Sequence, residues 1–90
     1  MIRRRFRFYG TVQGVGLRYT VRQAARAMGL TGFVRNEYDG SVTAEVQGDA
    51  PAIDRMREMV ENAPYIRIDR WGCTGLPVDP QERAFRVLFW

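Results

Sequence analysis

The chain has 90 residues, 46% hydrophobic and 27% charged, so it is expected to form a single domain over residues 1–90, and a disordered chain is excluded. All 14 basic residues are arginines and outnumber the 10 acidic ones, giving a net charge of +4 that favours anionic partners without separating a phosphorylated small molecule from nucleic acid. The single cysteine, Cys73, cannot form an internal disulfide, and without any histidine it supports neither Cys–His catalysis nor a zinc site. Cys73 is therefore predicted to be structural.

The N-terminal third is predicted to form a strand, a glycine-rich turn and a helix. In residues 3–9, Phe6 and Phe8 alternate with arginines, which indicates one buried and one wet strand face, and the arginines at 3–5 are expected to be a solvated start. The helix that follows the turn at 10–16 ends at Gly29 and leaves Arg22 and Arg26 on its polar face. Its apolar residues recur at helical spacing: Val21, Ala24, Ala25 and Met28.

The middle of the chain is predicted to form a hairpin and a second helix. Strands at 32–36, with Phe33 expected in the core, and at 41–47 flank a turn at 37–40 that contains the hairpin dipeptide Asp-Gly. Asp49 is positioned to cap the next helix, and Pro51 suits its first turn. That helix has its own apolar stripe and stops at Pro64: Ile53, Met56, Val60 and Ala63.

The C-terminal third is predicted to add a strand at 65–73, a loop at 75–81 and a last strand at 85–89 in which Phe85, Val87 and Phe89 alternate. The resulting order, β-α-β-β-α-β plus one strand, is that of the α+β ferredoxin-like sandwich. We therefore expect an antiparallel sheet with two helices on one face and an extra C-terminal strand. Many functions use this fold, so it does not by itself assign one.

Residues 10–18, read GTVQGVGLR, carry the first functional signal. Glycines between a strand and a helix allow a sharp bend, and the free N–H groups at the helix start can bind an anion, to which Arg18 would add a bidentate donor. The segment is neither a Walker A loop, since lysine is absent, nor a dinucleotide fingerprint, since Tyr19 stands at the third glycine position. A tight turn whose glycines only allow packing is the alternative.

Asn36 carries the second signal, at a strand end just before the turn. Asparagine here commonly caps local backbone. The alternative is an amide that orients a water molecule for attack. The residues alone leave both interpretations open, as they do for Arg35 and Tyr38, which either contact a substrate or are solvated.

Both segments resemble the signatures of the acylphosphatase family. Residues 10–18 are similar to G-x-V-Q-G-V-x-[FM]-R, and residues 32–48, GFVRNEYDGSVTAEVQG, match the second signature at every defined position. The spacing and the chain length also resemble the family's. Two departures, Leu17 for the usual Phe or Met and Phe8 for an aliphatic residue, are apolar exchanges that remove no polar catalytic group.

The resemblance implies hydrolysis of acyl phosphates to a carboxylate and inorganic phosphate, with no metal or other cofactor. It implies that Arg18 and Asn36 are catalytic, Arg18 binding the phosphoryl oxygens and Asn36 positioning water. It implies that the loop contributes to substrate binding through backbone N–H groups. The loop residues concerned are Gln13, Gly14, Val15, Gly16, Leu17 and Arg18.

The expected partner is a small acyl phosphate, with no nucleic acid and no membrane, and the protein is expected to be a cytoplasmic monomer. No apolar run approaches the roughly 20 residues of a membrane span, and the N-terminus lacks the apolar stretch of a signal peptide. An RNA-recognition module has the same element order, but the strand at 41–47 lacks its stacking aromatics. An inactive regulatory domain and a relative of the hydrogenase-maturation domain that acts on carbamoyl phosphate are further alternatives.

Overall fold

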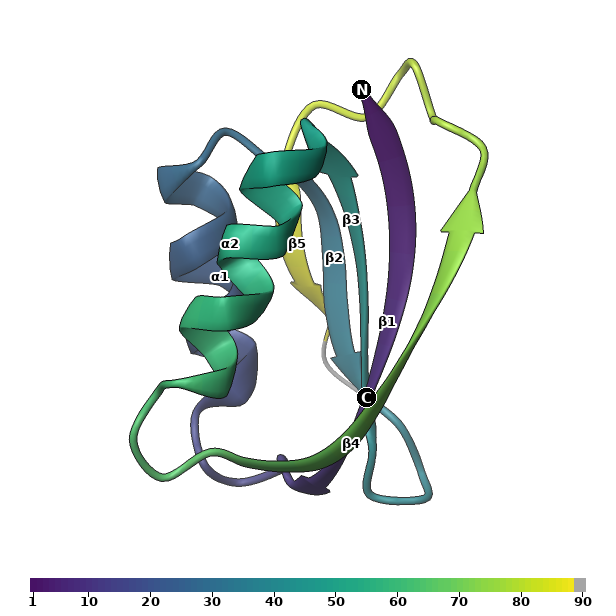
Figure 1. Ribbon diagram of the computed structural model, residues 1–90. Coiled ribbons are helices and arrows are strands. Elements are labelled where there is room, and N and C mark those ends of the chain that lie inside the picture. The colour runs from purple at the N-terminus through teal and green to yellow at the C-terminus, as the bar shows by residue number, and fades with distance from the viewer. Residues whose placement is uncertain (89–90) are drawn as a thin grey trace.

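The computed structural model describes residues 1–88, which form five strands and two helices (Figure 1). The elements are, in chain order, β1 (Ile2–Thr11), α1 (Leu17–Ala27), β2 (Thr31–Asn36), β3 (Val42–Gly48), α2 (Ala50–Glu61), β4 (Arg67–Leu76) and β5 (Phe85–Leu88). Every predicted strand and helix is present, and the ferredoxin-like plan is confirmed. Phe89, the end of the predicted strand at 85–89, lies outside the described residues.

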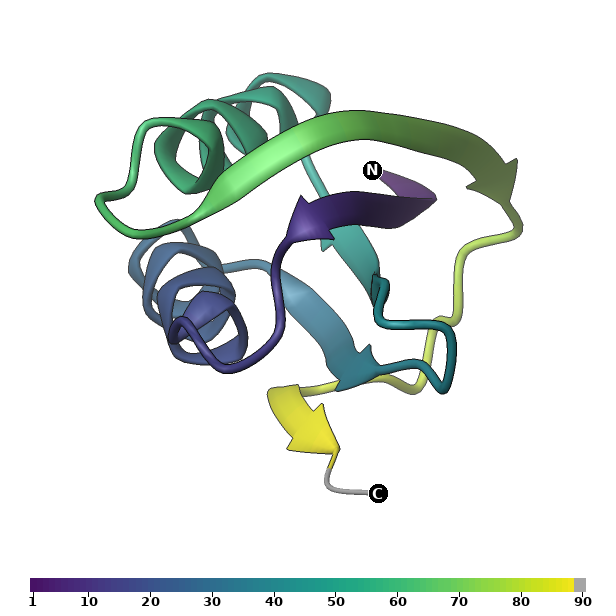
Figure 2. The same ribbon diagram turned by 90° about the horizontal axis from the view of Figure 1, so that it is seen from below.

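The strands form one sheet in the order β4-β1-β3-β2-β5, and both helices pack on the same face of it (Figure 2). The pairings among β1 to β4 are antiparallel, as expected, but β5 runs parallel to β2, so the sheet is mixed. β4 ends at the end of the sheet where β2 begins. The loop 77–84 crosses that end beside the N-terminus (Figure 1), and a strand that starts there must therefore run in the direction of β2.

The core lies between the sheet and the helices and follows the predicted alternation. Phe6 and Phe8 of β1 are buried and stacked on each other, with ring centroids 5.8 Å apart. The apolar stripes of the two helices close over them. Asp49 is the N-cap of α2 and Pro51 lies in its first turn, although the Asp49 side chain makes no capping hydrogen bond.

The open face of the sheet corrects two predictions. Arg3 is buried rather than solvated: its guanidinium donates to Glu45 at 3.1 Å and to Glu82 at 2.7 Å, because the crossing loop lies over it. The hydrogen bonds from this guanidinium to Glu82 and Glu45 outweigh its burial and raise the pKa of Arg3. Phe33 is only half-buried and lies outside the core, because the neighbouring Val34 takes the inward position.

Cys73 is exposed on β4 and not part of the buried core, so packing gives no support to the expected structural role. None of the helices in residues 1–88 is both long and apolar enough to cross a membrane.

Candidate active site

The loop between β1 and α1 owes its glycines to backbone conformation. Gly14 and Gly16 have φ angles of 74° and 80°, in the left-handed region that residues with a Cβ rarely adopt. A Cβ built at either position would meet no atom within 4 Å. Gly10 differs, since a Cβ there would lie 2.3 Å from the carbonyl oxygen of Arg67. Packing alone thus explains Gly10 but neither Gly14 nor Gly16.

The loop leads directly into α1, and the backbone N–H groups at this junction form no hydrogen bonds within residues 1–88. Gly16 is the N-cap and provides no side-chain cap, and the first helical N–H groups have no acceptor within the helix. Within residues 1–88, the backbone N–H groups of residues 14–17 donate no hydrogen bond. A helix N-terminus with free donors and the positive end of its dipole favours a bound anion.

Arg18 lies at the start of α1 and is positioned by β5. Its Nη1 donates to the carbonyl oxygen of Leu88 at 3.2 Å, and two turns later Nη2 of Arg26 donates to the carbonyl oxygen of Phe85 at 3.3 Å. β5 is the edge strand beside β2 and also contacts α1, and its end holds the guanidinium of Arg18 at the mouth of the loop. The extra C-terminal strand therefore has a direct role in the geometry of the site.

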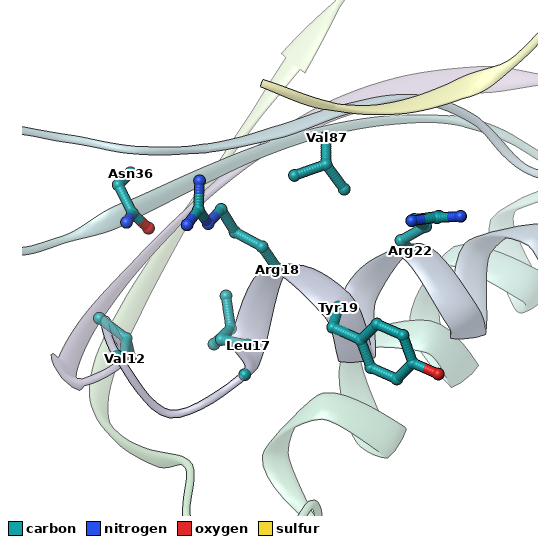
Figure 3. Close-up of a pocket in the computed structure, with 9 residues that line it drawn as sticks. Val12, Leu17, Arg18, Tyr19, Arg22, Asn36 and Val87 are labelled. Atoms are coloured by element: carbon teal, nitrogen blue, oxygen red, sulfur yellow. The ribbon is translucent and has the colours of Figure 1, made fainter. Parts of the chain in front are cut away.

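Asn36 ends β2 on the helix-facing side of the sheet, in the same alternation as the buried Val34. Its amide points toward Arg18 (Figure 3). The side chain makes no hydrogen bond within the described part of the chain. The turn is closed by others: Asp39 accepts from the backbone N–H of Ser41 at 2.9 Å. Turn capping therefore does not explain Asn36.

The loop, Arg18 and Asn36 surround a cavity of about 280 Å³ (Figure 3). Val12, Gly14, Gly16 and Leu17 line it from the loop, and Tyr19, Arg22 and Val87 extend it beyond Arg18. A second hollow of about 250 Å³ lies on the hairpin side of Asn36, beside Gln13, Glu37 and Tyr38. Of the residues that the structure describes, Asn36 alone lines both.

The Gln13 side chain joins the loop to the hairpin. Its Nε2 donates to the carbonyl oxygens of Glu37 at 2.7 Å and Ser41 at 3.0 Å. Because Asn36 immediately precedes this hairpin, the same amide fixes the distance between the two halves of the site. Gln13 and Val15 do not line the larger cavity, whereas the other four predicted loop residues do.

The carboxylates next to the site belong to the hairpin and accept hydrogen bonds from neighbouring residues of the protein. Burial raises the pKa of Glu37, but hydrogen bonds from Thr43 at 2.9 Å and Arg35 at 3.3 Å outweigh it and hold the pKa below its ordinary value. The hydroxyl and backbone N–H of Ser41 lower the pKa of Asp39. Within residues 1–88 no group of three or more His, Cys, Asp or Glu side chains could hold a metal ion.

Sequence reasoning missed part of the cavity wall. Arg22 was expected on the polar face of α1, and Val87 in the packing of the last strand, yet both line the cavity. The signal for Arg22 was its spacing of four residues from Arg18, which places the two side chains on one helix face. Arg35 lies outside this cavity, and Tyr38 is fully exposed beside the second hollow.

The comparisons with known proteins include matches to acylphosphatases by sequence and by structure. The family model described as Acylphosphatase matches residues 4–87. An acylphosphatase of Mannheimia succiniciproducens is 42% identical over 71 residues, or 78% of this chain and 79% of the relative. An acylphosphatase of Caldanaerobacter subterraneus subsp. tengcongensis is 38% identical over 82 residues, which are 90% of this chain and 91% of the relative. The crystal structure of acylphosphatase from Bacillus subtilis matches with a TM-score of 0.91 and 30% identity, over 99% of this chain and 100% of that one.

Proposed function

The chain belongs to the acylphosphatase family, and from this premise we propose how its residues hydrolyse an acyl phosphate. Its activity is the hydrolysis of acyl phosphates, and it is a hydrolase acting on acid anhydrides. The assignment of roles to residues is the proposal. The observation that carries it is the convergence of free loop N–H groups, the Arg18 guanidinium and the Asn36 amide on one cavity.

The phosphoryl group lies at the N-terminus of α1. Backbone N–H groups from Gln13 to Arg18 bind its oxygens, and the guanidinium of Arg18 adds charged hydrogen bonds. Phosphoryl transfer is accelerated mainly by positioning and by neutralising charge, and a preformed set of donors supplies both. The hydrogen bond from Arg18 to Leu88 supports this role, because it fixes the guanidinium before substrate binds.

Asn36 positions the attacking water. Its amide oxygen accepts a hydrogen bond from the water, whose oxygen attacks phosphorus in line with the leaving carboxylate. The new P–O bond forms as the bond between phosphorus and the acyl oxygen breaks, and the water's proton passes to a phosphate oxygen. The leaving carboxylate has a pKa of about 4, so no general acid is required. The position of Asn36 between the two hollows supports this role.

Small acyl phosphates are the substrates, and we further propose a single domain that acts as a cytoplasmic monomer without nucleic acid. The exposed, unpaired Cys73 suits a reducing compartment. The aromatic rings of the open sheet face are already covered by the protein's own guanidinium groups. Arg70 lies 4.1 Å from the ring centroid of Tyr9, and Arg35 lies 5.5 Å from that of Phe33. These rings are therefore poor platforms for bases.

Hydrolysis of benzoyl phosphate in water enriched in oxygen-18 tests the proposal, with Asn36→Ala beside the wild type. The label should enter inorganic phosphate and not benzoate. Asn36→Ala should lower kcat by about 100-fold with a small change in KM, since it removes positioning rather than binding. Asn62→Ala, an exposed amide at the end of α2, is the matched control and should leave kcat unchanged. Label in benzoate, or an Asn36→Ala enzyme with normal kcat, would refute these roles.

A further inference from the structure

Three arginines follow one another at intervals of four residues along α1, and their side chains therefore project from the same side of the helix. The outer two are tied to β5, Arg18 through the carbonyl oxygen of Leu88 and Arg26 through that of Phe85. Arg22, between them, makes no hydrogen bond or ion pair with any residue from 1 to 88. It is half-buried and lines the active-site cavity.

A guanidinium in this position attracts an anionic partner. It stays ionised at every working pH, and partial burial in a wall shared with apolar side chains strengthens its attraction for negative charge. No carboxylate of residues 1–88 pairs with Arg22, whereas most of the other arginines pair with carboxylates or carbonyl groups. The unmet partner is therefore best sought in the ligand of the cavity.

The geometry relates this group to the phosphoryl site. Four helical residues rise about 6 Å, so Arg22 lies about one turn beyond the Arg18 end of the cavity. Val87 lies between the two arginines, and Tyr19 lies on the opposite wall (Figure 3). A short apolar segment anchored by phosphate at one end would pass Val87 and bring its far end to Arg22. The cavity volume of about 280 Å³ suits a small ligand.

We propose that Arg22 is a specificity residue that binds a second anionic group, a carboxylate, at the far end of the acyl chain. The favoured substrates are acyl phosphates of short dicarboxylic acids, with about two or three carbons between the acyl carbon and the distal carboxylate. Val87 and Tyr19 contact the methylene groups of that chain. The inference rests on the proposed function, because it takes the phosphoryl group to lie at Arg18.

Two probes that differ only in the distal charge test it: succinyl phosphate and its distal methyl ester. The measured quantity is the ratio of their kcat/KM values. For the wild type this ratio should be about fivefold to tenfold in favour of succinyl phosphate, as for a partly exposed charged hydrogen bond. Arg22→Gln should bring the ratio to about one, and Arg22→Glu should bring it below one. Arg55→Gln, which removes an equal charge from an exposed position on α2, should keep the wild-type ratio.

A wild-type ratio near one, or an Arg22→Gln ratio equal to that of the wild type, would overturn the inference while leaving the hydrolytic function intact. A loss of preference in Arg55→Gln as large as that in Arg22→Gln would also overturn it, since net charge would then explain the selectivity. Failure of the wild type to hydrolyse either probe would instead refute the proposed residue roles on which the inference rests.

Discussion

Replacing Gln13 by alanine should separate the two halves of the active site without touching either proposed catalytic side chain. Gln13 Nε2 holds the carbonyl oxygens of Glu37 and Ser41 at 2.7 and 3.0 Å, and this is the side-chain link between the phosphate-binding loop and the hairpin beyond Asn36. Neither acceptor is left unpaired, because the N–H of Gly40 still donates to the Glu37 carbonyl and the N–H of Glu37 still donates to the Ser41 carbonyl. The main consequence is therefore a looser hairpin.

The size of the effect follows from the two hydrogen bonds. Each contributes about 1 kcal/mol, so Gln13→Ala should lower the free energy of unfolding by about 2 kcal/mol and the Tm by about 10 °C. A displacement of a reacting group by about 1 Å can lower a rate by as much as 100-fold. We therefore expect kcat to fall by about tenfold while KM for benzoyl phosphate changes by less than about threefold, because Arg18 and the loop N–H groups remain.

Urea unfolding and steady-state phosphate release measure the two effects on the same preparations. Gln23→Ala is the matched control, since Gln23 donates only one exposed hydrogen bond, to Tyr19, and lies outside the cavity. Its stability should stay within about 0.5 kcal/mol of the wild type. A Gln13→Ala enzyme with wild-type stability and kcat would show that the link between loop and hairpin does not position Asn36.

Three further predictions concern stability. Arg3→Leu leaves the carboxylate of Glu82 without its ion-pair partner, while Glu45 keeps Arg5, and should cost about 3 kcal/mol in urea unfolding. Replacement of the half-exposed Arg5 by leucine should cost less than about 1 kcal/mol, and equal losses would refute the role of the Arg3 pairing. The lowered pKa values of Glu37 and Asp39 add stability that is complete above their ordinary pKa values of 4.5 and 3.8 and is lost as pH falls through the folded pKa values. The free energy of unfolding should therefore decline below about pH 4.5, and it should decline less steeply in Glu37→Gln. Parallel pH profiles of the wild type and Glu37→Gln would contradict this. Gly16→Ala should cost only about 1–2 kcal/mol, because its Cβ meets open space, and a much larger loss of Tm would indicate a steric role.

The fold was predictable because local patterns determine most of it. Alternation predicted that Phe6 and Phe8 lie on the buried face of a strand, and helical spacing predicted that Val21 and Ala25 lie on the buried face of a helix. All four side chains are buried as expected. The site roles of the loop and Asn36 stay predictions, but the structure bears on the alternative explanation of each. The left-handed φ angles with empty surroundings exclude a packing role for Gly14, and the unbonded amide excludes turn capping by Asn36.

What sequence reasoning missed depends on contacts distant in the chain. Arg3 is buried because Glu82, 79 residues later, crosses over it, and nothing near position 3 signals that contact. Arg22 faces the cavity because β5 docks beside α1: its spacing from Arg18 indicates a shared helix face but not the strand that this face meets. The parallel direction of β5 likewise follows from the path of the loop 77–84. Phe33 was different, since alternation with Val34 would have placed it outward.

The most direct test of the catalytic site is phosphate release from benzoyl phosphate in the presence of EDTA, by the wild type and by Arg18→Ala, with Arg55→Ala as the charge-matched control. The wild type and Arg55→Ala should hydrolyse the substrate rapidly despite the chelator. Arg18→Ala should lose at least about 100-fold in kcat/KM, mainly through weaker binding of the phosphoryl group. An Arg18→Ala enzyme as fast as the wild type would contradict the phosphate-binding role of Arg18, and a folded wild type no faster than spontaneous hydrolysis would contradict the mechanism as a whole.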